Sequence, residues 1–248
     1  MRSVIIIPAR LHSTRLPRKP LLCETGKPLV LHTYEQAVKS RYADGVCIAG
    51  DEQFMVAALQ TKWMGFAGEP PLFLSDGAFP DGTSRVADLA RRLHRKGKLS
   101  ESSVVVNLQC DEPEIDPADI DRLIEAAHAD ESRSIWTLAG PIATAGYTDP
   151  NTVKVTIHDG RATEFSREPL PRSLHHIGCY AFPYDFLAEF RPPADDTRDL
   201  EQTRWMEAGQ TIRVLYCDRT PQAINTPEDY RAFVKRYAVD RVMVDAGS

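Results

Sequence analysis

The sequence predicts an α/β protein whose core is a doubly wound, mostly parallel sheet. Over residues 1–140, short runs rich in valine and isoleucine alternate with longer amphipathic stretches. Short β-branched runs are typical of buried strands, and their regular alternation with helices is typical of a parallel sheet. From about residue 150 the strands follow one another without full helices between them, which predicts added antiparallel strands. We therefore expect a single domain over 1–248 with a small antiparallel lobe at about 150–210.

The expected elements follow from the apolar periodicity and from the turn residues between them. In the first half we expect strands at 3–7, 46–49, 72–74, 103–108 and 135–138, and helices at about 29–38, 52–63, 84–96 and 117–129. In the second half we expect strands at 153–157, 162–165, 176–182 and 212–215, and helices at 195–207 and from 227 to about 237.

A positively charged loop follows the first strand, which stops at Pro8. Open α/β sheets bind their ligands at the carboxyl ends of such strands. Clustered cations repel one another, and an anion with several charges, such as a nucleoside triphosphate, relieves that repulsion. A solvated basic loop accounts for the charge equally well, so charge alone leaves both interpretations open. The cations of the loop are Arg10, Arg15, Arg18 and Lys19.

Composition excludes several classes of protein. The net charge is −5, from 30 basic and 35 acidic residues, which disfavours a protein that coats nucleic acid. No apolar run approaches the roughly 18–20 residues needed to cross a bilayer, and the apolar start is too short for a signal peptide. The five cysteines are scattered and form no CxxC pair, which disfavours zinc and disulfides. We expect reduced thiols, a cytoplasmic location, and neither nucleic acid nor membrane as a partner.

The spacing within the cationic loop carries more information than its charge. Residues 8–10, 13–17 and 19–21 read Pro-Ala-Arg, Ser-Thr-Arg-Leu-Pro and Lys-Pro-Leu. This pattern resembles the opening motif of the 3-deoxy-manno-octulosonate (Kdo) cytidylyltransferase family. The resemblance implies that Arg10 and Lys19 bind the phosphates of CTP, with Arg15 as support. The family usually has glycine where this chain has Arg18, so we expect a different loop conformation or an extra anionic contact.

The same resemblance carries implications for the whole molecule. It implies the Rossmann-like fold of the nucleotide-diphospho-sugar transferases, with the lobe at about 150–210 serving sugar binding and dimerisation. It also implies Mg²⁺ as the cofactor, CTP and a Kdo-like acid sugar as the small-molecule partners, and a homodimer.

The strand at 103–108 ends at Gln109-Cys110-Asp111-Glu112-Pro113. A strand-end aspartate is a suitable hard ligand for Mg²⁺, although a solvated turn is the alternative. The segment resembles the family's Gln-Gly-Asp-Glu-Pro, which implies that Asp111 binds the metal and that Gln109 contacts the acid sugar. Because Cys110 replaces the family's glycine, we expect an altered backbone or a narrower pocket.

A second metal ligand is implied near the end of the chain. The family's Asp-Thr-Pro-Glu-Asp corresponds to residues 225–229, which read Asn-Thr-Pro-Glu-Asp. Thr226 and Pro227 begin a helix well whatever the function, because threonine caps and proline suits the first position. Asn225 offers a carbonyl oxygen without a negative charge, so we expect weaker binding of the metal.

The turn at 81–85 reads Asp-Gly-Thr-Ser-Arg and corresponds to the family's Ser-Gly-Thr-Glu-Arg, which lies against cytosine and ribose. The resemblance implies that Gly82, Thr83 and Arg85 contact CTP, and we expect Thr83 to cap the helix that follows. A purely structural turn remains an alternative. Asp81 and Ser84 depart from the family pattern, as does Gly50, where threonine is common.

Three further segments resemble parts of the family that lie at the acid sugar. They are Phe165-Ser166-Arg167, the strand His176-Ile177-Gly178-Cys179-Tyr180, and Leu200-Glu201-Gln202 followed by Arg204. A guanidinium suits a sugar carboxylate because it donates two parallel hydrogen bonds. Residues 151–155 match another family stretch, which we interpret as scaffold. The residues implied at the sugar are Arg167, His176, Tyr180, Glu201 and Gln202.

We therefore expect an Mg²⁺-dependent cytidylyltransferase that transfers CMP from CTP to the anomeric hydroxyl of Kdo, with release of pyrophosphate. The same chemistry on another acid sugar, such as an amino-octulosonate or a nonulosonate, is the first alternative. The second is a non-catalytic homologue that binds nucleotide or sugar, and Asn225 is its main support. An NAD-binding dehydrogenase is disfavoured, because no GxGxxG follows any expected strand.

Overall fold

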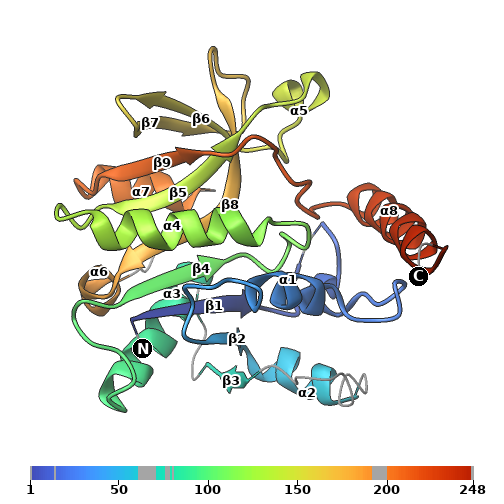
Figure 1. The fold of residues 1–248 in the computed structure, drawn as a ribbon, viewed down its shortest axis with the longest axis horizontal. Helices are drawn as coiled ribbons and strands as arrows, with labels where there is room; N and C mark the ends of the chain where they lie inside the picture. The colour runs from blue at the N-terminus through green and yellow to red at the C-terminus, as the bar shows by residue number, and fades with distance from the viewer. Residues whose placement is uncertain are drawn as a thin grey trace.

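A computed structural model describes residues 2–13, 15–60, 71–75, 79, 81–191 and 200–246 of the chain. Within them nine strands form one sheet with helices on both faces (Figure 1). The strands are β1 Ser3–Ala9, β2 Val46–Gly50, β3 Leu72–Leu74, β4 Val104–Leu108, β5 Ile135–Gly140, β6 Lys154–His158, β7 Arg161–Ser166, β8 Leu174–Pro183 and β9 Ile212–Tyr216. The helices are a 3₁₀ turn Lys19–Leu21, α1 Leu29–Ala37, α2 Glu52–Gln60, α3 Gly82–Arg95, α4 Pro117–Ala129, α5 Thr144–Thr148, α6 Tyr184–Glu189, α7 Glu201–Glu207 and α8 Pro227–Ala246.

The order of the strands confirms the α/β class but corrects the prediction of a mostly parallel sheet. The order is β3-β2-β1-β4-β8-β5-β9-β7-β6. Strands β3, β2, β1 and β4 are parallel, as are β5 and β9, but β8 runs antiparallel between β4 and β5. A parallel neighbour requires a crossover helix, whereas the segment that leads through β6 and β7 to β8 has none. The sheet is therefore mixed, and β8 enters its centre instead of standing beside it.

The expected antiparallel lobe takes the form of a ring of strands. β6 pairs with both β7 and β8, and β7 also pairs with β9 through Arg161 and Arg213. Because β9 pairs with β5 and β5 with β8, the five strands β8, β5, β9, β7 and β6 close on themselves. Figure 1 shows β6 and β7 rising above the rest of the sheet. The long strand β8 thus connects the ring to the parallel half.

Two hydrophobic clusters lie on opposite faces of the sheet. One holds α1, α2 and α4 and the other holds α3, α6 and α7. Strand β1 contributes to both, since Ile5 and Ile7 face the first cluster while Val4 and Ile6 face the second. All of β1 is buried, which explains its uninterrupted apolar run.

Several expected helix boundaries shift in the structure. The expected helix at 84–96 begins at Gly82, and its cap is Asp81, whose carboxylate accepts from the amide of Ser84 at 2.7 Å. The prediction that Thr83 caps this helix is therefore wrong, because Thr83 already lies in its first turn. Helix α8 continues to Ala246, beyond the expected end near 237, since no glycine or proline interrupts it. Residues 61–63 and 195–199 of two other expected helices lie outside the described part of the chain.

The expected start of α8 is confirmed in detail. The Asp229 carboxylate accepts from the amide of Thr226 at 2.8 Å, and the Thr226 hydroxyl accepts from the amide of Asp229 at 3.2 Å. This reciprocal pair satisfies two amides that the first turn of a helix leaves without partners.

Two other expectations can be checked against the whole described chain. All five cysteines are free, and only Cys23 is exposed. Among the described residues, the helices are all too short or too polar to span a membrane.

The departure at Gly50 has a packing explanation. A Cβ atom on Gly50 would lie 2.2 Å from Cδ1 of Phe54, which is completely buried between α2 and the sheet. Phe54 thus occupies the space that a side chain at residue 50 would need.

We expect Gly50→Thr to lower the free energy of unfolding by about 1–3 kcal/mol, because the added atoms overpack the site of Phe54. Denaturant unfolding of the wild type, Gly50→Thr, Phe54→Ala and the double variant measures this. The double variant should lose less than the sum of the single losses, because the two changes share one space. Equal unfolding midpoints for Gly50→Thr and the wild type would contradict the packing explanation.

Candidate active site

A cavity of about 190 Å³ opens at the carboxyl end of β4, and segments far apart in the sequence form its wall. They are the cationic loop, the turn after β4, β8, the start of α7 and the segment before α8. The residues implied by the resemblance that line this cavity are Arg15, Gln109, Asp111, Arg167, His176, Tyr180, Glu201, Gln202 and Asn225.

An ion pair joins the cationic loop to the turn after β4. Nζ of Lys19 donates to Oδ2 of Asp111 at 2.5 Å and to the carbonyl of Ile224 at 2.9 Å. The amide of Ile224 in turn donates to the carbonyl of Asp111 at 2.9 Å. Burial alone would lower the pKa of Lys19, but the attraction of Asp111 outweighs it and the net shift is upward. Lys19 therefore stays charged, and three chain segments meet at this pair.

The other cations of the loop have different environments. Arg10 is exposed just beyond β1 and does not line the cavity, although its charge acts on buried Arg85. Arg18 has φ of 56° and ψ of 23°, in the left-handed region. Glycine adopts this conformation without steric strain, which explains why the family has glycine at this position.

Asp111 and Asn225 provide the oxygen atoms that a divalent ion would need. Both line the cavity, and the described residues contain no cluster of three or more His, Cys, Asp or Glu side chains suited to a metal. Mg²⁺ typically takes one or two protein oxygens and completes its shell with water and substrate phosphates, so the pair fits it. The carboxylate of Asp229 accepts from the amides of Asn225 and Thr226, so it serves as a helix cap.

His176 lies completely inside the protein at the other end of the cavity. Its Nε2 lies 2.9 Å from the hydroxyl of Thr137, and that hydroxyl donates to the carbonyl of Cys179 at 2.8 Å. Because the Thr137 hydroxyl already donates its proton to Cys179, the hydrogen bond between Thr137 and His176 must use a proton on Nε2. Nδ1 of His176 is then an acceptor. Burial, assisted by the charge of His175, lowers the pKa of His176 to about 3. The imidazole is therefore neutral.

Two more polar side chains are paired beside His176. The amide of Gln202 on α7 donates to the hydroxyl of Tyr180 on β8. Burial and then the charge of Glu201 raise the pKa of Tyr180 well above its usual value, so its phenol stays protonated. The ring of Tyr180 packs against that of His176 with centroids 5.2 Å apart.

The segment 151–155, interpreted from the sequence as scaffold, contributes Asn151 and Val153 to the wall of the cavity. A guanidinium nitrogen of Arg15 donates to Oδ1 of Asn151 at 2.6 Å, and Arg167 donates to the carbonyl of Pro150 at 3.0 Å. The completely buried Lys154 donates to the carbonyls of Asp149 and Arg167 at 2.7 and 2.6 Å. Arg15 thus reaches toward the arginine implied at the sugar, and Asn151 lies in the cavity with it.

The turn at 81–85 lies beside the cavity, and none of its residues lines it. The amides of Gly82 and Thr83 both donate to the carboxylate of Glu201 at 3.3 Å. Thr83 is completely buried and its hydroxyl accepts from Asn107. Arg85 is also buried, and it contacts Ser75 at 3.0 Å and Asp51 at 3.8 Å.

Glu112 is a cavity residue to which the sequence analysis assigned no role. One carboxylate oxygen accepts from the amide of Gly178 at 2.9 Å, and the other is buried without a hydrogen-bond partner among the described residues. Burial and then the charge of Asp111 raise the pKa of Glu112 to about 8. The sequence signal that could have identified Glu112 was its position next to Asp111 in the motif at 109–113.

Cys110 does not line the cavity, so the expectation of a narrower pocket is wrong, while the alternative of an altered backbone stays a prediction. Its side chain lies in the hydrophobic cluster under α1 and α4, and its carbonyl accepts from Thr33 at 3.0 Å. Burial raises the pKa of its thiol to about 12, so the thiol is not ionised. The side chain points into the core because alternate residues of a strand face the same side, and Val106 and Leu108 of β4 lie in this cluster too.

Comparison with known proteins assigns this arrangement to a class. A family model described as cytidylyltransferase matches residues 4–212, and the chain therefore belongs to the cytidylyltransferase family of nucleotidyltransferases. Within that family it groups with the 3-deoxy-manno-octulosonate cytidylyltransferases, which confirms the resemblance seen in the motifs.

The relatives match over nearly their whole length. The 3-deoxy-manno-octulosonate cytidylyltransferase of Syntrophobacter fumaroxidans is 38% identical, with 98% of this chain and 99% of that protein covered. That of Escherichia coli is 33% identical, with 91% and 92% covered. The structure of CMP:2-keto-3-deoxy-manno-octonic acid synthetase complexed with CTP superposes with a TM-score of 0.79 at 31% identity, covering 97% and 100%. 4-Diphosphocytidyl-2C-methyl-D-erythritol synthase, at 15% identity and a TM-score of 0.63, shares the fold.

The neutral state of His176 predicts a loss of stability in acid. The His176 side chain takes up a proton near pH 6.5 in the unfolded chain but only near pH 3 in the folded protein. The stability that neutral His176 contributes is therefore lost as the pH falls through that window. Between pH 7 and pH 5, we expect the wild type to lose about 2 kcal/mol more than His176→Gln. Guanidinium unfolding at both pH values measures the difference. Equal losses in the two proteins would show that His176 is not held neutral.

Proposed function

We propose that this chain transfers CMP from CTP to the anomeric hydroxyl of Kdo and releases pyrophosphate. The observation that carries the proposal is one cavity lined both by Asp111, which is paired with Lys19, and by a set of groups suited to an acid sugar. The names of the relatives and the CTP complex of a similar structure support the choice of substrates.

At the nucleotide end, Lys19 and Arg10 bind the triphosphate, and Arg15 supports them. Without nucleotide, Asp111 neutralises Lys19 at 2.5 Å. A triphosphate provides this lysine with a second anionic partner, and charge-assisted hydrogen bonds to phosphate are strong. In this proposal Gly82, Thr83 and Arg85, which belong to the first turn of α3, contact the cytidine.

Asp111 and Asn225 hold Mg²⁺ in this proposal. When bound, the ion draws the phosphate oxygens together and offsets the charge that develops on the leaving pyrophosphate. Because Asn225 adds no charge, the site depends more on the phosphates of the substrate than a site with two carboxylates would.

At the sugar end, Arg167 pairs with the sugar carboxylate through two parallel hydrogen bonds. Neutral His176 accepts from a sugar hydroxyl through Nδ1, because its Nε2 is already bound to Thr137. Gln109, Tyr180, Glu201 and Gln202 contact the remaining hydroxyls.

The chemical step is an in-line displacement. The anomeric oxygen attacks the α-phosphorus, the bond from that phosphorus to the bridging oxygen breaks, and the hydroxyl proton is released. The chain contributes position and electrostatic complementarity, which account for most of the rate in phosphoryl-type transfers. The family resemblance supports a homodimer as the working form, and the free cysteines support a cytoplasmic location.

The direct test of the proposal is the release of pyrophosphate from CTP, Kdo and Mg²⁺. We expect Asp111→Asn to lower kcat/KM by about 100-fold or more, as loss of a group that stabilises transition-state charge does elsewhere. Amino-octulosonate and nonulosonate substrates, tested in parallel, separate the alternative sugars. If no acid sugar releases pyrophosphate while a known Kdo enzyme is active in the same assay, the proposal fails.

Asn225→Asp tests both the role of residue 225 as a Mg²⁺ ligand and the alternative that the chain is a non-catalytic homologue. We expect the Mg²⁺ concentration for half-maximal rate to fall about tenfold, since a carboxylate binds this ion better than an amide. Asn151→Asp is the matched control, because it adds the same charge to another wall of the cavity. A protein that binds its substrates without turnover should gain no activity from either substitution. Equal effects of the two substitutions on the Mg²⁺ dependence would argue against Asn225 as a metal ligand.

A further inference from the structure

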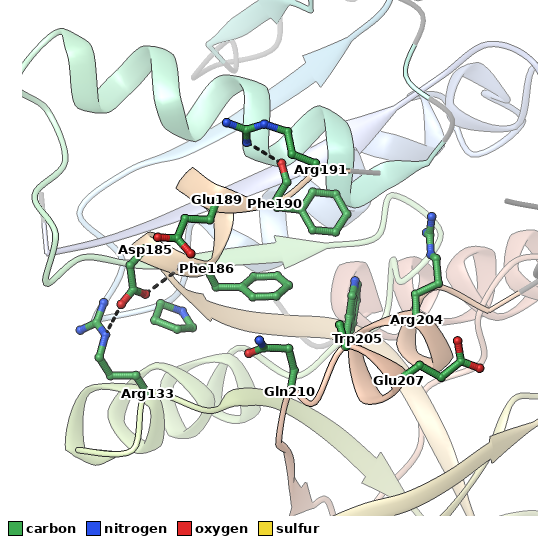
Figure 2. A pocket seen from close by; sticks show the side chains of 12 residues that line it. Arg133, Asp185, Phe186, Glu189, Phe190, Arg191, Arg204, Trp205, Glu207 and Gln210 are labelled. Carbon is green, nitrogen blue, oxygen red and sulfur yellow. Dashed lines mark hydrogen bonds and ion pairs between the residues drawn. The ribbon is translucent and has the colours of Figure 1, made fainter. Parts of the chain in front are cut away.

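An ion pair outside the catalytic cavity connects the turn before α3 to α7. A guanidinium nitrogen of Arg204 donates to Oδ2 of Asp81 at 2.6 Å, and each side chain is only 10% exposed. Figure 2 shows Arg204 and Trp205 on α7 at a second cavity, of about 680 Å³, with the guanidinium extending away from the helix. Separating an ion pair this well buried would leave an uncompensated charge, so the contact favours the observed placement of α7 against the turn before α3.

The two oxygens of Asp81 have separate partners. Oδ1 accepts from the amide and the hydroxyl of Ser84, at 2.7 and 2.5 Å, and so caps α3. Oδ2 accepts from Arg204. An asparagine can keep the first contact through its carbonyl oxygen but removes the charge from the second. The capping and pairing roles of Asp81 can therefore be separated by substitution.

A second contact links the same two elements one helical turn away. The Glu201 carboxylate, at the start of α7, accepts from the amides of Gly82 and Thr83 at the start of α3. Glu201 and Arg204 are three residues apart, so they project from one face of α7. The Glu201 carboxyl group accepts from the first amides of α3, and the Arg204 guanidinium meets Asp81. Helix α7 is thus attached to α3 at two points.

The local sequence favours this arrangement. In Asp-Gly-Thr-Ser-Arg, Asp81 stands first and Ser84 fourth, which is the spacing between a capping side chain and the amide that it accepts from. The same carboxylate reaches Arg204. Gln202, the residue after Glu201 on α7, lines the main cavity and bonds to Tyr180 there.

We propose that Asp81 is a positioning residue for the acid sugar: by holding Arg204, it fixes α7 so that Glu201 and Gln202 face the sugar. This inference rests on the proposed function for its kinetic consequence, but the attachment of α7 is independent of any substrate.

Asp81→Asn is the decisive variant. We expect the KM for Kdo to rise about tenfold, the size of a coupling between neighbouring side chains, while the KM for CTP and kcat stay within about twofold because α3 remains capped. Asp185→Asn is the matched control, since it removes an Arg133–Asp185 contact of 2.7 Å whose side chains are 40% and 46% exposed. That control should leave both KM values unchanged. Unchanged values for Asp81→Asn, an equal rise for both substrates, or a rise for CTP alone would overturn the inference.

A measurement without substrate separates this inference from the proposed function. Amide hydrogen exchange in α7 should be faster in Asp81→Asn than in the wild type, while exchange in α3 stays the same. Asp81→Ser, which also caps, provides a second variant if the first folds poorly. If the wild type has no activity, the proposed function fails and the exchange result still decides whether Asp81 holds α7. Wild-type exchange in α7 of both variants would overturn the inference.

Discussion

The contact between Lys19 and Asp111 is the constraint on which the candidate site depends. It joins the loop after β1 to the turn after β4, and Lys19 also binds the backbone of Ile224 before α8. Lys19 and Ile224 lie near opposite ends of the sequence and Asp111 lies near its middle, and the parallel pairing of β1 with β4 brings the first loop and the Asp111 turn to one edge of the sheet. Two opposite charges withdrawn from water stabilise each other only when they are in contact, so this pair defines where the three segments meet.

The position of β8 provides the other half of the cavity. Because β8 runs antiparallel between β4 and β5, its residues His176 to Tyr180 reach the same edge as Asp111 from the opposite direction. An additional parallel strand there would have presented the other end of its sequence to the cavity. The mixed order of the sheet therefore brings the residues proposed to bind the sugar next to those proposed to bind the phosphates and the metal.

Burial determines the protonation of the groups around this edge. The pKa of His176 falls while those of Glu112 and Glu201 rise, to about 8 and 7, and in all three burial is the largest cause. The wall of the cavity is accordingly richer in neutral hydrogen-bonding groups than its composition suggests. Permanent charge remains on the arginines, which suits the recognition of a substrate that is itself anionic.

The sequence by itself determined the class of fold, most strands and helices, and nine of the sixteen residues that line the cavity, because apolar periodicity and short motifs are local properties of the chain. Only the tertiary structure decided that β8 lies in the centre of the sheet, since strand order depends on pairing between distant segments. It also decided that Cys110 faces the core and that Phe54 fills the space at Gly50. The roles of Asp81 and Glu112 emerged only in space, because burial and contacts with distant residues define them.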